Sequence, residues 1–314
     1  MDSFSPADAS LFFTKNDPQD VRLGELFKNS KIEDSSFAIL GYPDDEGIAL
    51  NGGRPGAALA PDKIRQFLYK MTPSRKTNPI FADGGNLNAA SYDLAGRHEA
   101  VKATVFELQS RGVKTITLGG GHDYGYPDAA GFLKACAKNQ ERPLVLNFDA
   151  HLDVRPATKG FNSGTPFFRL LSDPEFKNSF DFAEIGIQPQ CNSQNHREWA
   201  LAQKAHVIDL KEVNKHGLQC LFRHRALQHV TKRTPVFVSF DIDAITSSEA
   251  GGCSQSWVTG LKTQDFLDFF AELCQCSDVR GLGIYEVSPP LDTDNRTAKI
   301  AALIAYNFLF QETT

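Results

Sequence analysis

The stretch Leu144-Val-Leu-Asn-Phe-Asp-Ala-His-Leu-Asp153 joins a nearly continuous apolar run to three side chains of the kind that bind metals. A short apolar run is typical of a strand buried on both faces of a parallel sheet. Because alternate residues of an extended segment point the same way, Asp149, His151 and Asp153 should lie on one side of the chain. A buried strand that ends in Asp-x-His-x-Asp therefore predicts a metal site.

Two other segments also carry such side chains directly after an apolar run. They are Gly119-Gly-Gly-His-Asp123 and Ser239-Phe-Asp-Ile-Asp243. A lone Asp-x-Asp at a strand end more often caps a helix or closes a turn, but six such side chains at three strand ends are hard to explain as caps. The expected metal ligands are His122, Asp149, His151, Asp153, Asp241 and Asp243.

Apolar, β-branched runs alternate with segments of helical period along most of the chain. The alternation predicts an α/β fold with a doubly wound, mainly parallel sheet and helices on both faces. The carboxyl ends of parallel strands share one edge, where binding crevices form, so the three acidic segments should meet there. With no linker or repeat, we expect one domain over 1–314. The expected strands are 37–42, 79–83, 115–118, 144–149, 182–187, 207–209, 236–241 and 281–287, and the clearest helices are 98–111 and 263–276.

The composition excludes several classes of function. A net charge of −5 without long basic runs disfavours nucleic acid and anionic membranes as partners. The first residues do not resemble a secretory signal, and no apolar stretch is long enough to span a membrane. Six scattered cysteines without a C-x-x-C pair are expected to be reduced. We therefore expect a cytoplasmic protein.

The ligand types indicate which metal is bound. Four carboxylates and two imidazoles without a thiolate favour Mn²⁺, with Co²⁺, Ni²⁺ or Fe²⁺ as less favoured occupants. Without a cation, the clustered carboxylates would be protonated instead. Four carboxylates neutralise two divalent ions, which at about 3.5 to 4 Å could share a bridging water and lower its pKa.

Glu286 ends the last expected strand at the same edge. A carboxylate there could hold an amidinium or guanidinium group by paired hydrogen bonds, whereas a helix cap or a surface position is the plainer alternative. The remaining histidines fit surface or satisfied core positions, and we assign them no role: His98, His196, His206, His216, His224 and His229.

The three motifs, in this order along nearly the whole chain, resemble those of the ureohydrolases, the family of arginase, agmatinase and formimidoylglutamase. The resemblance implies an arginase-like three-layer α/β/α fold with two Mn²⁺ per chain. By the same resemblance, Asp149 and Asp241 would bridge the ions, Asp153 would pass a proton to the departing amine, and Glu286 would orient the substrate. His122 and Asp153 would complete one ion's ligands, and His151 and Asp243 the other's.

One segment distinguishes the branches of this family. Arginases and agmatinases generally carry a Ser-Gly-x-x-His-Gly segment, whereas this chain reads Asn162-Ser-Gly-Thr-Pro-Phe167, which is similar to formimidoylglutamases. The resemblance implies hydrolysis of N-formimino-L-glutamate to L-glutamate and formamide. For its carboxylates, we expect donors among Arg54, Arg155, Arg169, Asn162 and Ser163.

Several alternatives stay open at this stage. The chain could be a guanidino hydrolase acting on agmatine, arginine, guanidinobutyrate or guanidine. It could also be a metal-poor relative without turnover. A single-zinc deacetylase of the same general fold would leave the second aspartate pair superfluous. The family resemblance also implies a homo-oligomer, a trimer or a hexamer.

Overall fold

The computed structural model describes residues 3–28, 30–74 and 80–310. Nine strands form one sheet in the order β1-β3-β2-β4-β9-β8-β5-β6-β7, in which β1 pairs antiparallel with β3 and every other pairing is parallel. The strands are β1 (Phe4–Ser5), β2 (Phe37–Gly41), β3 (Phe81–Leu87), β4 (Lys114–Leu118), β5 (Leu144–Phe148), β6 (Asp181–Ile187), β7 (His206–Asp209), β8 (Pro235–Asp241) and β9 (Asp278–Tyr285).

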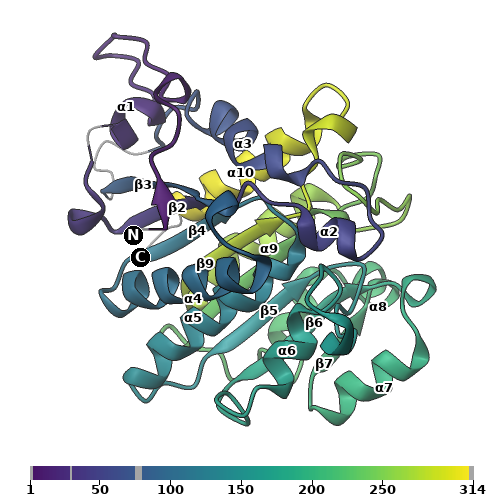
Figure 1. The fold of residues 1–314 in the computed structure, drawn as a ribbon. Helices are drawn as coiled ribbons and strands as arrows, with labels where there is room; N and C mark the ends of the chain where they lie inside the picture. The colour runs from purple at the N-terminus through teal and green to yellow at the C-terminus, as the bar shows by residue number, and fades with distance from the viewer. Residues whose placement is uncertain (1–2, 29, 75–79, 311–314) are drawn as a thin grey trace.

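Helices cover both faces of this sheet, and they enclose a core on each side (Figure 1). Residues of β5 alternate between the two: Leu144, Leu146 and Phe148 contribute to one core, and Val145 to the other. On the first face lie α3 (Ala60–Leu68), α8 (Leu210–His216), α9 (Thr263–Cys276) and α10 (Arg296–Leu309); on the second lie α4 (Leu94–Ser110), α5 (Gly125–Lys138), α6 (Pro166–Ser172) and α7 (Gln194–Ala202).

The predicted three-layer α/β architecture is confirmed, because every residue of β2, β5 and β8 is buried, as covering on both faces requires. Two short helices, α1 (Leu23–Lys28) and α2 (Glu46–Leu50), complete the set of α-helices among the described residues. Most predicted strands match within one or two residues at each end. Pro79, the first residue of one predicted strand, lies outside the described residues.

The largest differences from the sequence prediction concern β3 and β1. The strand β3 continues past Asp83 to Leu87, and β1 was not predicted. The two strands pair where Gly85 has a φ of +82°, and a Cβ added there would collide with the backbone carbonyl of Ser5. The pairing depends on glycine for both reasons.

The middle of the sheet sets the position of the site. The neighbouring strands β4, β9, β8 and β5 are all parallel, so their carboxyl ends open onto one edge. The three acidic segments and Glu286 follow these four strands directly. Residues that are up to about 165 positions apart in the sequence therefore lie at the ends of neighbouring strands in one rigid sheet.

Candidate metal centre

The imidazole of His122 lies at the centre of the first group of ligand-type side chains. Its Nε2 atom is 2.8 Å from Oγ of Ser239, and its ring stacks on Tyr285 with centroids 5.1 Å apart. The turn before it, between β4 and the 3-10 helix His122–Tyr124, uses Gly120 with a φ of +82°. A Cβ there would lie 3.0 Å from the carbonyl of Tyr42, so this tight approach favours glycine.

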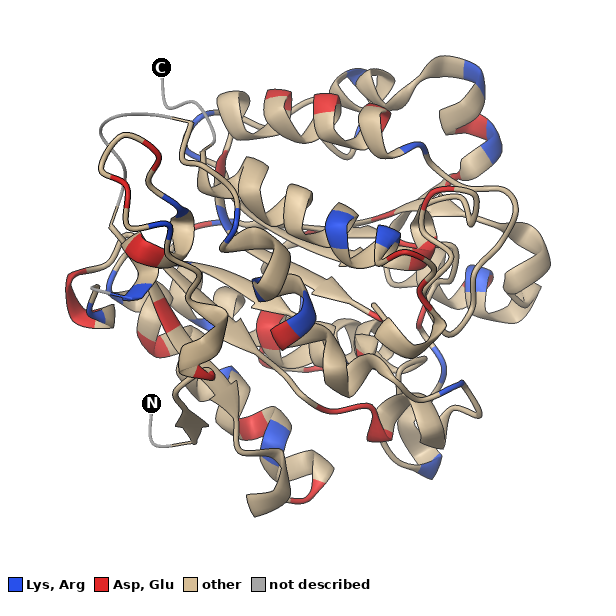
Figure 2. Cartoon of the chain, turned by 90° about the horizontal axis from the view of Figure 1, so that it is seen from above, with Lys and Arg blue, Asp and Glu red and all other residues tan. Residues whose placement is uncertain are grey.

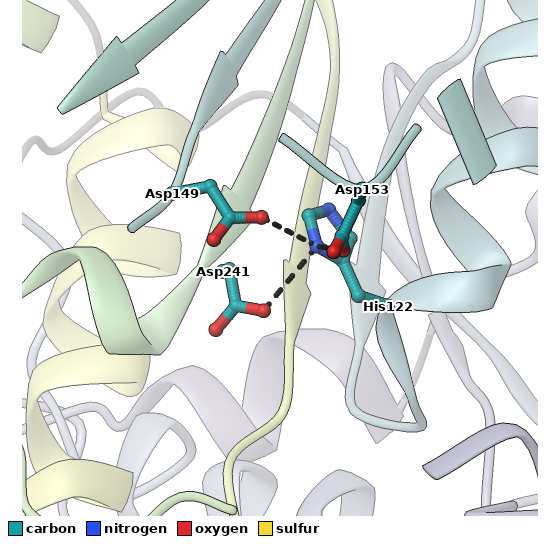
Figure 3. A group of neighbouring side chains, drawn as sticks. All are labelled: His122, Asp149, Asp153 and Asp241. Carbon is teal, nitrogen blue, oxygen red and sulfur yellow. Dashed lines mark ion pairs between the residues drawn. The ribbon is translucent and has the colours of Figure 1, made fainter. Parts of the chain in front are cut away.

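Three carboxylates converge on the other ring nitrogen of His122 (Figure 3). Its Nδ1 atom lies 3.0 Å from an oxygen of Asp149, 3.0 Å from Asp153 and 3.2 Å from Asp241. This nitrogen finds no well-aligned hydrogen-bond acceptor among the described residues. If Nε2 donates to Ser239, the lone pair of Nδ1 faces carboxylate oxygens, an arrangement that a shared cation would stabilise.

Asp149 also belongs to a second group. Nδ1 of His151 lies 2.9 Å from Asp243 and 3.3 Å from Asp149. The ligand atoms within each group, His122, Asp149, Asp153 and Asp241 in one and Asp149, His151 and Asp243 in the other, all lie within 4.8 Å of one another. The structure thus brings all six predicted ligands together around one shared carboxylate.

The two aspartates that were expected to bridge are not equivalent. The carboxylate of Asp149 directs Oδ2 to the first group and Oδ1 to the second. In Asp241, only Oδ2 faces His122, and Oδ1 accepts a hydrogen bond of 2.8 Å from the backbone N–H of Asp243. The predicted bridging role of Asp241 therefore stays a prediction, as does each ligand assignment.

Burial makes this cluster electrostatically costly. Burial, followed by the charge of Asp149, raises the pKa of Asp241 to about 6. Burial and then Asp241 raise the pKa of Asp243 well above its ordinary value. Burial lowers the pKa of His122, but its carboxylate partners more than reverse this and raise it well above the ordinary value. A bound divalent cation would supply the counter-charge that these buried carboxylates need.

Asn192 holds the loop that carries Asp149, His151 and Asp153. Its Oδ1 accepts a hydrogen bond of 2.8 Å from the backbone N–H of Leu152, and its Nδ2 donates to the carbonyl of Ala150 at 2.9 Å. Asp153 itself has a φ of +48°, an uncommon conformation that aspartate tolerates better than most residues. These contacts fix the direction of the predicted ligands.

Glu286 is the predicted carboxylate at the end of β9. It has a φ of +64°, and its Oε1 atom accepts a hydrogen bond of 3.0 Å from the backbone N–H of His122. Burial, and next the charge of Asp241, raise its pKa well above the ordinary value. The carboxylate of Glu286 can accept further hydrogen bonds next to the predicted metal ligands, because Glu286 lines the same cavity as Asp153, Asp241 and Asp243.

This cavity has a volume of about 250 Å³ and opens above the two groups. The described residues that line it are Asn51, Gly53, His151, Asp153, Arg155, Ser163, Cys191, Asp241, Asp243, Ser254, Gln255, Trp257 and Glu286. Arg155 is the only lysine or arginine among them. Asn51 links the rim, because its side chain accepts from Arg155 at 2.8 Å and donates to Ser163 at 3.1 Å.

Of the five predicted substrate contacts, two line the cavity and three do not. Arg155 and Ser163 line the cavity. The guanidinium of Arg54 instead donates to the backbone carbonyls of Cys253 and Ser254, and the side chain of Asn162 accepts from the N–H of Gly164. Neither of these lines the cavity, and neither does Arg169, whose guanidinium contacts His98 instead.

Several rim residues were not found from the sequence. Asn51 begins a glycine-rich loop, Trp257 lies in an irregular segment, and Cys191 ends the short 3-10 helix Pro189–Cys191, so none of them has a periodic signal. His196 was assigned no role, yet it lines an adjoining cavity together with Arg155 and Cys191. All six cysteines are free, as expected.

The model of the arginase family matches residues 35–311. A formimidoylglutamase of Salmonella heidelberg (strain SL476) is 30% identical over 307 residues, which cover 97% of this chain and 93% of that protein.

Solved structures give the same result. Formiminoglutamase of Trypanosoma cruzi, crystallised with Mn²⁺, superposes with a TM-score of 0.82 at 29% identity, over 93% of this chain and 98% of that one. Proclavaminate amidino hydrolase of Streptomyces clavuligerus shares the fold, with a TM-score of 0.73 at 24% identity over 88% and 91% of the two chains. The arginase-like fold class predicted from the sequence is therefore confirmed.

Proposed function

The chain belongs to the arginase family, and we propose that it is a dinuclear metal hydrolase that converts N-formimino-L-glutamate and water to L-glutamate and formamide. The observation that carries this proposal is the shared carboxylate of Asp149, with one ligand group on each side of it below a cavity that holds a single arginine. Relatives that are named for this activity extend over nearly the whole chain.

Two Mn²⁺ ions fit the donor set, which is dominated by oxygen and contains no thiolate. His122, Asp149, Asp153 and Asp241 would hold one ion, and Asp149, His151 and Asp243, with Asp241 as the remaining expected ligand, would hold the other. When bound, such ions supply the Lewis acidity that lowers the pKa of a water molecule towards neutrality. Co²⁺, Ni²⁺ and Fe²⁺ are weaker candidates for the same donors.

The protein's own groups would orient the substrate. Glu286 would accept N–H groups of the amidinium, because its carboxylate lines the cavity beside Asp241 and is held by the backbone of His122. Asp153, which also lines the cavity, would carry a proton to the nitrogen of the departing amine. This proton transfer completes the cleavage of the C–N bond.

The rim of the cavity suits an anionic tail. Formiminoglutamate carries two carboxylates, and Arg155, Asn51 and Ser163 present a connected set of donors. A guanidino substrate with a cationic tail would be repelled by Arg155. The polar rim thus supports the formimino substrate over agmatine.

The direct test is a product assay on purified protein reconstituted with Mn²⁺. We expect release of formamide and L-glutamate in equal amounts from N-formimino-L-glutamate, and no urea from agmatine, arginine, guanidinobutyrate or guanidine. Urea release without formamide would refute the substrate, and absence of turnover in a protein that holds Mn²⁺ would refute the activity.

Three wider expectations accompany this function. We propose that residues 1–314 form one catalytic domain, that the protein assembles as a trimer or hexamer, and that it acts in the cytoplasm on a small molecule rather than on nucleic acid. In Figure 2, Lys and Arg are interspersed with Asp and Glu instead of forming one basic face. No helix in the described ranges is long and apolar enough to cross a membrane. Light scattering after size-exclusion chromatography would determine the assembly.

A further inference from the structure

Arg169, on α6, is a partly buried cation near the site. Its Cζ atom lies 3.7 Å from the ring centre of Tyr126 and 3.6 Å from that of Phe161. A guanidinium between two aromatic faces is attracted to both. Burial lowers the pKa of Arg169 to about 10, so the side chain remains charged at neutral pH and needs these partners.

A chain of hydrogen bonds leads from Arg169 to the turn that carries His122. Nη1 of Arg169 lies 2.8 Å from Nδ1 of His98, and Nε2 of His98 lies 2.8 Å from Oδ2 of Asp123. Arginine can only donate, so Nδ1 accepts and Nε2–H donates to the carboxylate. One neutral tautomer of His98 therefore satisfies both partners, and His98 and Asp123 are both buried.

The same arginine also contacts the loop 157–165, which follows the metal-ligand segment. Phe161 in this loop covers the guanidinium and lies 5.9 Å from the ring of His98. Ser163 reaches the rim of the cavity, and its N–H donates to the carbonyl of Gly47 at 3.1 Å. Gly47 in turn packs so closely on Asp123 that an added Cβ would collide with the carboxylate.

The outer half of this loop has little else to hold it. The backbone of 157–161 makes no hydrogen bond to the rest of the described chain, and Thr158, Lys159 and Gly160 are exposed. Phe161 is thus its main anchor on the protein interior. Loss of the stacked cation would free the outer half of the loop.

We propose that Arg169 is a positioning residue that locks the loop 157–165 against the His122 turn and so places Ser163 at the rim of the cavity. This inference adds a positioning residue to the proposed function. Its effect on kinetics rests on that function, whereas its effect on the loop does not. The contacts of Arg169 account for its burial close to a cavity that it does not line.

The first test is limited digestion by trypsin, which needs no substrate. Lys159 is exposed, and Lys159–Gly160 is the only trypsin site between 154 and 168, because proline follows Arg155. In R169M, which keeps an unbranched side chain but removes its charge and donors, we expect cleavage at Lys159 to be at least about fivefold faster. R169K keeps the cation and should lie between R169M and the wild type.

Arg280 provides a matched control. It is a half-buried arginine at the amino end of β9, where it binds Glu141 and Asp278. R280M should lower the melting temperature and leave the rate of cleavage at Lys159 unchanged. Wild-type cleavage rates in R169M, or an equal acceleration in R280M, would overturn the proposal. F161L serves as a second variant if R169M does not fold, and it should show the same faster cleavage.

The second test is kinetic. R169M and F161L should raise the KM for N-formimino-L-glutamate by about tenfold, while kcat stays within about threefold and the Mn²⁺ content is unchanged. A fall in kcat or in metal content at constant KM would contradict a role in substrate positioning. If the wild type releases no formamide, the proposed function fails, and the tryptic cleavage still decides whether Arg169 locks the loop.

Discussion

At the scale of single residues, Asp149 connects the two ligand groups. Both of its oxygens face an imidazole, at 3.0 Å for His122 and 3.3 Å for His151. In D149N, an amide NH2 group, which cannot bind a cation, replaces one carboxylate oxygen. We expect Mn²⁺ content to fall from two ions to one or fewer per chain and kcat to fall by more than about 100-fold.

Elemental analysis and formamide release would measure these effects together. D209N is a suitable control, because Asp209 pairs with Arg197 far along the sheet on β7. The control should keep both ions and the wild-type rate. Retention of two tightly bound ions by D149N would show that Asp149 does not bridge.

The second prediction for a single residue concerns Arg155. Its Nη1 is engaged by Asn51, and it is the single lysine or arginine at the described cavity wall. Loss of a charge-assisted hydrogen bond to a carboxylate costs about 1.5 to 3 kcal/mol, so R155A should raise the KM for N-formimino-L-glutamate by roughly 10- to 160-fold. R155K should recover part of the loss.

A guanidino substrate with a cationic tail tests whether the charge of Arg155 determines which substrate binds. If R155A binds agmatine better than the wild type does while it loses affinity for formiminoglutamate, then Arg155 selects for anionic tails. An unchanged KM for formiminoglutamate in R155A would exclude Arg155 from the substrate site.

The predictability of the site differs between these two kinds of residue. The six ligand-type side chains could be found from the sequence because each follows a buried strand, and strand ends share an edge. Arg54 and Arg155 could not be told apart, because backbone carbonyls of a distant loop bind Arg54. Asn51 and Trp257 depend on how irregular segments fold, which periodicity does not predict.

At the scale of elements, glycines allow the chain to pack closely at its edges. The substitution G85A would force a Cβ onto the carbonyl of Ser5 at a φ of +82°. We expect β1 to detach and the free energy of unfolding to fall by about 2 to 4 kcal/mol, whereas kcat should not change, because β1 lies at the far edge of the sheet.

Gly112 allows the cost of backbone strain to be separated from the cost of the steric collision. It has a φ of +81° with nothing within 4 Å of an added Cβ, so G112A reports backbone strain alone, roughly 1 kcal/mol. Urea denaturation of both variants would measure the difference. Equal losses would mean that the contact between β1 and β3 does not matter for stability.

The strands themselves were largely predictable from the sequence. Central strands such as β5 and β8 are buried on both faces and read as apolar runs. The strand β1 has two residues and an antiparallel partner, so no period could reveal it. Asn86 and Leu87 were missed because two glycines interrupt β3 before them.

At the scale of the whole molecule, the buried acids couple stability to pH. The pKa of Asp241 is raised to about 6 in the folded protein, so between about pH 4 and 6 the folded state binds more protons than the unfolded state. Stability of protein stripped of metal should therefore fall as pH rises through this window. The raised pKa of His122 extends the fall above about pH 6.5.

Thermal unfolding of protein stripped with a chelator, from pH 4.5 to 8, would test this coupling. For Asp241 alone the loss is on the order of 3 kcal/mol. D241N, which cannot titrate, should flatten the profile, and saturating Mn²⁺ should restore stability at high pH. A melting temperature of the metal-free protein that rises from pH 5 to pH 7 would contradict the expected sign.

We propose above all that segments following four neighbouring strands together hold a pair of divalent ions. A crystal grown with Mn²⁺ and measured at the manganese absorption edge tests it most directly. We predict two anomalous-difference peaks per chain, one among His122, Asp149, Asp153 and Asp241 and one beside His151 and Asp243, with Asp149 contacting both. A single peak, or peaks away from these side chains, would show that these segments do not hold a pair of ions.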